Sequence, residues 1–438
     1  MANTGARGAP TKEWPNEMLC TGLLLIDAEK APEPGWIRVE DGRITAVEHG
    51  HTDERADIGG PDMLLCPAFV DAHIHLPQVD SVGCDGLELL PWLDRVVFPA
   101  EVWWGNGAAA SMTRTAVGRM VREGTFGFAG YLTSNAQAGA ETLRTLSAGV
   151  DGARLRFAAG RVAMDRNAPA ALIDEDLSRS AMTPAPSVAL CDDGLGDRGE
   201  VSVNPRFAIA CTDELLAECG WFVGQRAEAG RPVVMQTHLS ESIPECAFIA
   251  ELFPEDRDYT SVYDRAGLLT DRAILAHAVH LSDAEFAMVR ERGSVIAHCP
   301  IANTFLSSGL FDLDRAREHG VRLALGSDVA AGVDIAMPRV ARAMIEVAKI
   351  RKMTVAPRAG VPTPAEVWSM ITRGNAEALG WSETGRLEVG AHADILALRV
   401  PVTWRDEFLI GRIIYNWTSD LIADRVVGGV RVARPEGV

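Results

Sequence analysis

The amino-acid sequence predicts an α/β protein in which a (β/α)8 TIM barrel is joined to a small β-sandwich built from both chain ends. Between residues 64 and 329, eight short apolar segments with the length of buried strands alternate with segments whose apolar residues recur at helical spacing. Helical segments such as 283–293 and 312–320 finish with a glycine that can end a helix. Both chain ends instead contain short apolar runs separated by turn signals, which is typical of small β units.

The expected barrel strands follow one another along the middle of the chain. They cover residues 64–75, 124–131, 154–164, 203–211, 232–240, 273–281, 294–300 and 323–329. Eight such strand–helix units favour closure into a barrel, whose active site lies at the carboxyl ends of the strands. The segment Ser178–Glu200 shows little helical period, so we expect an irregular loop after the third strand.

The domain organisation expected from these patterns has four parts. Residues 1–17 form a flexible tail, residues 18–66 and 381–438 form the two parts of the sandwich, and residues 67–380 form the barrel. The pairs Asp41-Gly42 and Gly428-Gly429 predict tight hairpin turns in the two terminal parts. In the C-terminal part, residues 394–400, 413–420 and 423–435 have the texture of strands.

Composition argues against several classes of partner. The net charge of -18 and the pI of about 5.0 oppose binding to nucleic acid, which needs clustered Lys and Arg. Eight cysteines without a CxxC pair indicate neither a disulfide framework nor a thiolate zinc site. Apolar runs are too short to span a membrane, and the N-terminus lacks a signal-peptide pattern, so we expect a cytoplasmic protein. A homodimer is expected from the base rate among soluble proteins alone.

Five side chains able to bind a metal ion stand at the ends of expected strands. They are His73, His75, His238, His277 and Asp328. Successive strand residues point to opposite faces, so His73 and His75, at positions i and i+2, can grip the same ion. Three histidines and an aspartate can chelate one divalent ion and leave a position open for water. This set therefore indicates a hydrolytic enzyme.

A carboxylate accompanies one of these ligands. Glu241 lies three residues after His238, which suits a metal ligand followed by a proton carrier. Two further histidines have weaker cases. On a strand His280 would face the opposite side from His277, and His298 is expected to support the site rather than to bind metal.

Beyond single residues, longer stretches of the sequence resemble a known family. The motifs closely resemble the amidohydrolase superfamily of metal-dependent barrels and, within it, the guanine deaminase group. The similar stretches cover most of the barrel and are residues 73–78, 89–101, 205–216, 259–270, 297–309 and 324–332. The HxH and GSD patterns belong to the whole superfamily, whereas HIHLPQ, PRF and TSVYD are specific to the group. Ile301, Ala302 and the segment Ser178–Glu200 depart from its pattern.

The resemblance implies a metal site with assigned roles. His73, His75, His238 and Asp328 would hold one divalent ion, with zinc expected and iron an alternative. Such an ion lowers the pKa of bound water to about 7 and so supplies hydroxide for attack on C2 of guanine. His277 would hydrogen-bond to that water or act as a further ligand. Glu241 would shuttle the proton, and Asp328 would share this catalytic duty.

The resemblance also implies which side chains contact a small purine. Arg206 offers only donors, so it suits the carbonyl oxygen and bare ring nitrogen of guanine and disfavours adenine. Gln78 could read a ring edge, and Phe207 could stack on the purine face. The full set expected to line the substrate is His75, Gln78, Arg206, Phe207, His238, Glu241 and Asp328.

Two other hypotheses stay open on the sequence alone. The same metal site could deaminate another amino-heterocycle, such as an oxidised guanine, an aminopterin or a triazine, because Ile301 and the segment Ser178–Glu200 depart from the pattern. A catalytically silent barrel could instead serve as a scaffold, although the retained ligands and Glu241 argue against it. A panel of heterocycles separates the first possibility from guanine deamination, and elemental analysis tests the second.

Overall fold

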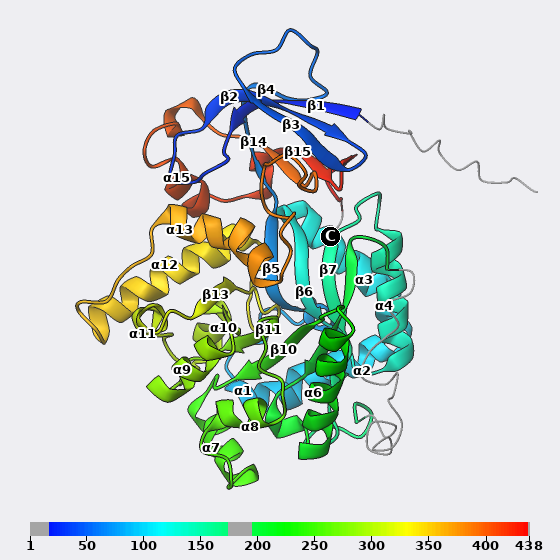
Figure 1. The fold of residues 1–438 in the computed structure, drawn as a ribbon, viewed down its shortest axis with the longest axis vertical. Coiled ribbons are helices and arrows are strands. Elements are labelled where there is room, and N and C mark those ends of the chain that lie inside the picture. Colours follow the sequence, from blue (N-terminus) through cyan, green and yellow to red (C-terminus); the bar gives the residue numbers. More distant parts are fainter. Residues whose placement is uncertain (1–16, 174–194, 437–438) are drawn as a thin grey trace, which may run out of the picture.

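The computed structural model describes residues 17–173 and 195–436 and contains a barrel with a separate sheet at one end (Figure 1). The expected tail 1–17 lies outside the described residues except for Glu17, which begins a strand. The expected loop Ser178–Glu200 also lies mostly outside them. Its last two residues, Gly199 and Glu200, begin a barrel strand.

Eight neighbouring parallel strands form the barrel wall, with a short ninth strand beside them. In chain order the strands are β5 (Phe69–His75), β6 (Thr125–Tyr131), β7 (Arg156–Gly160), β8 (Val162–Ala163), β9 (Gly199–Pro205), β10 (Val234–Leu239), β11 (Ala273–His277), β12 (Val295–His298) and β13 (Arg322–Leu325). Strand β8 pairs only with β9, and every pair between neighbouring barrel strands is parallel. Most of their residues are buried, which explains the continuous apolar runs in the sequence.

The barrel closes just beyond the end of β13. The N–H of Asp328 donates to the carbonyl oxygen of His73 at 2.9 Å, and the N–H of His75 donates to the carbonyl of Val329 at 3.3 Å. The Asp71 carboxylate also accepts the Ser327 N–H at 2.9 Å. These bonds join the last strand segment to the first, so the expected (β/α)8 fold is confirmed.

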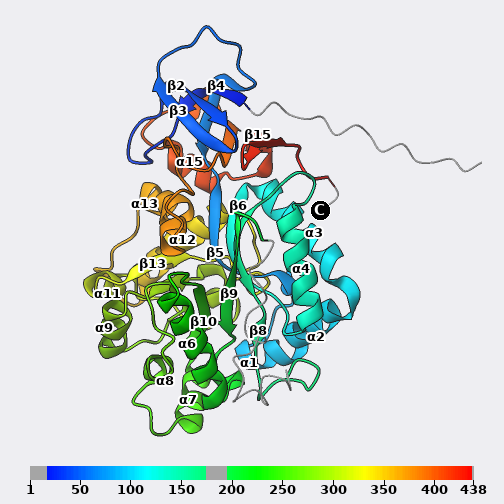
Figure 2. The same ribbon diagram turned by 45° about the vertical axis from the view of Figure 1, so that its right-hand side comes forward.

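Helices follow the strands, and the longer ones cover the outside of the barrel (Figures 1 and 2). They are α1 (Leu89–Trp92), α2 (Phe98–Trp103), α3 (Ala109–Glu123), α4 (Ala136–Ala148), α6 (Asp213–Glu228), α7 (Ile243–Leu252), α8 (Tyr259–Arg265), α9 (Asp283–Glu291), α10 (Pro300–Phe305), α11 (Leu313–Glu318), α12 (Met337–Thr354), α13 (Pro364–Ser369) and α14 (Asn375–Ala378). Gly293 and Gly320, just past α9 and α11, have φ of 68° and 67°. They end these helices as the sequence predicted.

Short helical segments of other types connect these elements. Wider π-type turns cover Leu93–Val97, Trp104–Ala108 and Met370–Gly374, and tighter 3-10 turns cover Leu76–Gln78, Ala208–Ala210, Val402–Trp404 and Ser419–Leu421. The first π-type segment joins α1 to α2 and the second joins α2 to α3. This nearly continuous helical run contains the stretch 89–101.

Both chain ends build one seven-stranded sheet with the strand order β16-β15-β14-β4-β1-β2-β3. The strands are β1 (Glu17–Leu24), β2 (Glu33–Glu40), β3 (Arg43–His49), β4 (Ile58–Pro67), β14 (Ile395–Arg399), β15 (Ile422–Val427) and β16 (Val430–Val432). Both expected hairpins are present, because β2 pairs antiparallel with β3 and β15 with β16. Asp41 and Gly42 have φ of 46° and 80°, the conformation that favours such turns.

This terminal sheet curls around its own apolar core. The Ala393 N–H donates to the Gly42 carbonyl at 2.9 Å, and the Gly429 N–H donates to the Ala393 carbonyl at 3.0 Å. The two hairpin turns at opposite ends of the sheet therefore meet. Only Ala68 separates β4 from β5, so the sheet stands at the start of β5 and leaves the carboxyl ends of the barrel strands free (Figure 2).

Three sequence predictions of secondary structure are corrected. The expected strand 203–211 stops at Pro205, and a 3-10 turn follows. The strand 273–281 stops at His277, where φ is 69° and extended structure ends. Residues 413–420 do not form a strand, because Leu409–Tyr415 is the helix α15, which buries Leu409, Ile410, Ile413 and Ile414 at helical spacing.

Two findings concern the wider expectations from composition. No helix in residues 17–173 or 195–436 is long and apolar enough to cross a membrane. Every described cysteine is a free thiol; these are Cys20, Cys66, Cys84, Cys211, Cys219, Cys246 and Cys299.

Candidate active site

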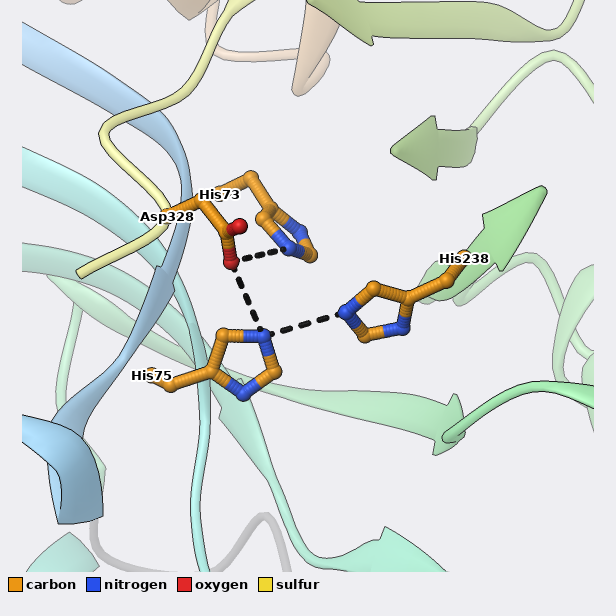
Figure 3. A group of neighbouring side chains, drawn as sticks. All are labelled: His73, His75, His238 and Asp328. Carbon is orange, nitrogen blue, oxygen red and sulfur yellow. Dashed lines mark hydrogen bonds and ion pairs between the residues drawn. The ribbon is translucent and has the colours of Figure 1, made fainter. Parts of the chain in front are cut away.

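The expected metal ligands converge at the carboxyl ends of the barrel strands. His73 and His75 end β5, His238 lies in β10, His277 ends β11, and Asp328 follows β13. Figure 3 shows the side chains of His73, His75, His238 and Asp328 pointing toward one another. One potential ligand atom from each of these four lies within 4.8 Å of all the others. His73 and His75, two residues apart on β5, therefore point in the same direction, as strand geometry predicts.

The contacts within this cluster are close. His73 Nε2 and His75 Nε2 each lie 3.3 Å from Asp328 Oδ1. His75 Nε2 also lies 3.1 Å from His238 Nε2. Three imidazole nitrogens and one carboxylate oxygen therefore surround a common point, which is the donor set that zinc or iron accepts.

The hydrogen bonds of His238 prepare it to bind a cation. Its Nδ1 lies 2.6 Å from the carbonyl oxygen of Arg206, which can only accept, so Nδ1 carries the proton and donates. Nε2 is then a bare lone pair directed at the cluster. Buried ring nitrogens of His73 and His277 also have no hydrogen-bond partner among the described residues. A cation would satisfy these atoms, so the residues fit a metal ion.

Burial and charge keep the cluster in its ligating form. Burial lowers the pKa of His75 to about 3 and that of His238 well below its usual value. Burial alone would raise the pKa of Asp328, but the contacts of its Oδ1 with His73 and His75, each at 3.3 Å, outweigh burial and hold that pKa well below its usual value. Neutral imidazoles beside an ionised carboxylate are the protonation states that bind a divalent ion.

His277 lies beside this group and has a fixed orientation. Its Nδ1 lies 2.8 Å from Asn303 Oδ1, while its Nε2 lies 3.4 Å from Glu241 Oε2 and 3.7 Å from Asp328 Oδ2. With the proton on Nδ1, Nε2 is an acceptor directed into the site. His277 also shares a second possible ligand group with His73 and Cys299. Asn303 was not predicted as a site residue, although it lies within the family-like stretch 297–309.

Glu241 is enclosed next to the cluster. It is buried, its Oε1 accepts the Ser308 hydroxyl at 3.2 Å, and its Oε2 faces His277. Burial and then the charge of Asp328 raise the pKa of Glu241 to about 8. A carboxyl group that exchanges its proton near neutral pH suits general acid–base chemistry.

A pocket opens directly onto these groups. Its walls are formed by the predicted residues together with apolar side chains: His75, Gln78, Leu89, Trp92, Leu93, Arg206, Phe207, His238, Glu241, His277, Leu306, Asp328 and Ala331. All seven predicted substrate-contacting residues are in this lining. His73 is not part of it. Apolar and polar side chains line the pocket in similar numbers, which suits a small flat molecule that carries several polar atoms.

Two sets of supporting residues were missed by the sequence analysis. Glu101 Oε1 lies 2.7 Å from a terminal nitrogen of Arg206 and forms a salt bridge with it, and Arg206 also lines the pocket. Tyr263 lies in the quoted stretch 259–270. Its hydroxyl donates to the His238 carbonyl at 2.8 Å and accepts the Ala208 N–H at 3.0 Å.

A second carboxylate holds the turn that carries Glu241. Glu245 accepts the main-chain N–H of Glu241 at 2.7 Å and that of Ser242 at 3.1 Å, and it receives the Tyr259 hydroxyl at 2.9 Å. Burial and then the charge of Glu241 raise the pKa of Glu245 to about 7. The turn is thereby fixed from the side away from the pocket.

The two histidines with weaker cases lie outside the four-residue ligand cluster. His280 Nε2 lies 2.7 Å from the Ser308 carbonyl oxygen. The His298 ring stacks on Phe311 with 4.7 Å between ring centroids, and the side chain is buried. His280 and Glu241 thus contact different atoms of the same residue, Ser308.

Comparisons with known proteins show which sequences and structures this chain is similar to. The sequence model described as "Amidohydrolase family" matches residues 64–431. The mouse (Mus musculus) protein named guanine deaminase is 32% identical over 335 residues, which are 76% of this chain and 72% of that protein. The Escherichia coli protein of the same name is 30% identical over 386 residues, which are 87% of this chain and 82% of that protein.

Solved structures give the same picture at the level of the fold. A guanine deaminase from C. acetobutylicum, described with guanine bound in its active site, superposes with a TM-score of 0.85 at 24% identity and covers 95% of this chain and 100% of its own. A variant of a triazine hydrolase superposes with a TM-score of 0.79 at 20% identity and covers 96% of this chain and 95% of its own. At these identities both likenesses concern the fold.

Proposed function

The chain belongs to the amidohydrolase family, and we propose that it catalyses the hydrolytic deamination of guanine to xanthine and ammonia. The observation that carries this proposal is the identity of 30% or more to curated guanine deaminases over most of the chain. The pocket supports it independently, because Arg206 and Gln78, which carry donors, line the same pocket as the histidine and carboxylate cluster.

We further propose that one divalent ion is held by His73, His75, His238 and Asp328. Zinc is the expected ion, and iron is the alternative. When bound, such an ion supplies Lewis acidity that lowers the pKa of a water molecule toward neutrality. His277 lies beside this group with Nε2 free to accept a proton or a hydrogen bond. Its role as a further ligand or as a hydrogen-bond partner remains part of the proposal.

The substrate contacts follow from donor and acceptor chemistry. Arg206 and Gln78 would donate to the carbonyl oxygen and unprotonated ring nitrogen of an oxopurine. Phe207, which is 4% exposed, provides an aromatic side chain for stacking. Adenine would place an amine against donors, and an unpaired buried polar group is costly. The pocket should therefore prefer oxopurines.

Glu241 would carry the protons. The oxygen of the attacking water forms a bond to C2 of guanine while Glu241 accepts its proton, and Glu241 then delivers that proton to the adjacent ring nitrogen. On collapse the C2 hydroxyl becomes the carbonyl, Glu241 takes up the proton of that hydroxyl and delivers it to the exocyclic amine, and the C2–N bond breaks so that ammonia leaves. Asp328 can accept a hydrogen bond from the water during attack. General acid–base catalysis of this kind contributes about 10²–10⁴-fold.

A substrate panel tests the proposal. Purified protein loaded with zinc is mixed with guanine, adenine, 8-oxoguanine, an aminopterin and an aminotriazine, and ammonia release and absorbance are followed. We expect the highest kcat/KM for guanine. A higher value for another heterocycle would assign the site to that substrate, and no guanine turnover at micromolar enzyme would refute the proposal. Sedimentation and localisation measurements check the expected homodimer and cytoplasmic location, which remain predictions.

A further inference from the structure

We propose that Glu101 is a positioning residue that orients Arg206 and Gln78 and compensates the charge of Arg206, so that the pocket selects uncharged purines over their anions. This inference rests on the proposed function, because it concerns the substrate class of the same site. Glu101 is not among the residues that line the pocket, so it acts through its two partners.

One carboxylate oxygen joins the two side chains expected to read the base. Glu101 Oε1 accepts a hydrogen bond from Arg206 at 2.7 Å and another from Gln78 Nε2 at 3.4 Å. Glu101 lies in α2 and is 0% exposed. Its main-chain carbonyl accepts the Thr133 hydroxyl at 3.2 Å, which fixes this turn of the helix against the loop after β6. The carboxylate is thus held in a set position behind the pocket.

These contacts determine which atoms the pocket presents. The Oε1 of Gln78 accepts the Ala330 N–H at 3.4 Å, so its Nε2 is the end directed at Glu101. The Gln78 amide nitrogen carries two N–H hydrogens, and only one of them donates to Glu101. Arg206 likewise gives one of its donors to Glu101 and keeps others for a ligand. Both side chains therefore present donors to an oxopurine edge.

The ion pair also sets the charge of the pocket wall. Arg206 is 2% exposed, and among the described residues Glu101 is the acid with which it forms an ion pair. Arg206 also lies over the Phe98 ring, with 5.4 Å from its guanidinium carbon to the ring centroid. A buried ion pair generally adds little to stability compared with apolar residues of similar size. A purely structural role therefore explains poorly why both charges are kept here.

The consequence is a preference between neutral and anionic purines. With Glu101 ionised, the guanidinium offers directed hydrogen bonds without a net local charge, which suits neutral guanine. Without that negative charge, Arg206 would attract an anion. The other titratable groups facing the ligand are the same in either case; they are His75, His238, Glu241, His277 and Asp328.

The test compares wild-type protein with Glu101→Gln, which keeps the shape and an acceptor oxygen. Binding of hypoxanthine and xanthine is measured by calorimetry on the metal-loaded proteins, at one pH above the pKa of xanthine and below that of hypoxanthine. Wild type should prefer neutral hypoxanthine. The variant should shift the ratio of the two Kd values toward the xanthine anion by about tenfold or more, the size of one charge-assisted interaction. An unchanged ratio would overturn the proposal.

Kinetics and controls separate positioning from general damage. We expect Glu101→Gln to raise KM for guanine about tenfold while kcat changes by less than about threefold, because the lost interaction belongs to binding. Glu285→Gln is the matched control, since Glu285 is also buried but caps α9 outside the pocket lining. It should leave the Kd ratio unchanged, and an equal shift in this control would also overturn the proposal.

Two further comparisons apply if Glu101→Gln does not fold or if the protein does not turn over guanine. If Glu101→Gln does not fold, Arg206→Met is compared with Arg206→Met/Glu101→Met. Arg206→Met leaves the Glu101 charge unpaired and should shift the Kd ratio away from the xanthine anion, and the added Glu101→Met should move the ratio back toward the wild-type value. No movement back in the double variant would contradict charge compensation between Glu101 and Arg206. If wild type binds hypoxanthine but does not turn over guanine, the proposed function fails while the binding comparison still decides the role of Glu101.

Discussion

Replacing Tyr263 by Phe should loosen the active site from behind while leaving the ligand side chains intact. The Tyr263 hydroxyl connects β10 to the turn after β9, because it donates to the His238 carbonyl at 2.8 Å and accepts the N–H of Ala208 at 3.0 Å. It also accepts the Thr237 hydroxyl at 3.0 Å. Tyr263 is fully buried, so no water replaces the lost oxygen without rearrangement.

The size of the effect follows from the groups left without partners. Thr237 keeps a second acceptor, the Arg206 carbonyl at 3.4 Å, so its loss is small. The Ala208 N–H and the His238 carbonyl lose their shortest contacts, and each unsatisfied buried group costs about 1–3 kcal/mol, or about 2–6 kcal/mol together. The low end is expected, because the Tyr259 hydroxyl also approaches the His238 carbonyl at 3.5 Å.

Urea denaturation, which gives the free energy of unfolding, and metal titration, which gives the metal affinity, test this prediction. The free energy of unfolding should fall by about 2–3 kcal/mol, and metal affinity should fall about 10-fold, as is typical when a group supporting a ligand is removed. Tyr415→Phe is the control, since the Tyr415 hydroxyl contacts only Lys349 Nζ, at 3.3 Å on the surface, among the described residues. The reasoning is refuted if Tyr263→Phe unfolds at the same urea concentration as Tyr415→Phe and binds zinc as tightly as wild type.

Three further predictions concern the site chemistry. Glu241→Gln should keep its metal by elemental analysis but lower kcat by about 10²–10⁴-fold, and wild-type rates would contradict the proton-carrier role. Dialysis against a chelator should abolish guanine turnover and lower the melting temperature, and zinc should restore both; full activity in protein shown to be metal-free would contradict this. Burial and the charge of Glu241 raise the pKa of Glu245 to about 7, so its contribution to stability is present at acid pH and is lost as pH rises toward 7. Glu245→Gln should therefore reduce the loss of stability over that range in urea denaturation, and an unchanged pH dependence would contradict the shift.

The fold could be predicted from the sequence wherever burial leaves a periodic pattern. Barrel strands such as β10 and β11 are buried on both faces and appear as short apolar runs. Strand ends were harder to predict, because they depend on single backbone conformations such as the positive φ of His277. Residues 413–420 were assigned to strand texture, whereas burial of Ile413 and Ile414 beside Leu409 and Ile410 makes this region helical up to Tyr415. Tertiary packing decides that choice.

For the candidate site as well, the sequence predicted some residues and not others. The convergence of His73 and His75 could be predicted because strand geometry gives positions i and i+2 a common face. Glu101 was missed because its partner Arg206 lies 105 residues away, and neither local period nor motif spacing encodes that contact. Asn303 and Tyr263 were missed for the same reason: each acts through one hydrogen bond or a few that only the closed barrel creates.

Barrel closure and ligand placement are one set of contacts. The Asp328 N–H donates to the His73 carbonyl, and one oxygen of Asp71 accepts both the His73 N–H at 3.1 Å and the Ser327 N–H at 2.9 Å. The main chain that carries two ligands from β5 is therefore tied to the main chain that carries the ligand after β13. A cation that binds here does not need to draw these segments together, so little ordering cost opposes its binding. On the proposed assignment of the metal ligands, the contacts that close the barrel therefore also fix the main chain of His73, His75 and Asp328, three of the four residues that would hold the ion.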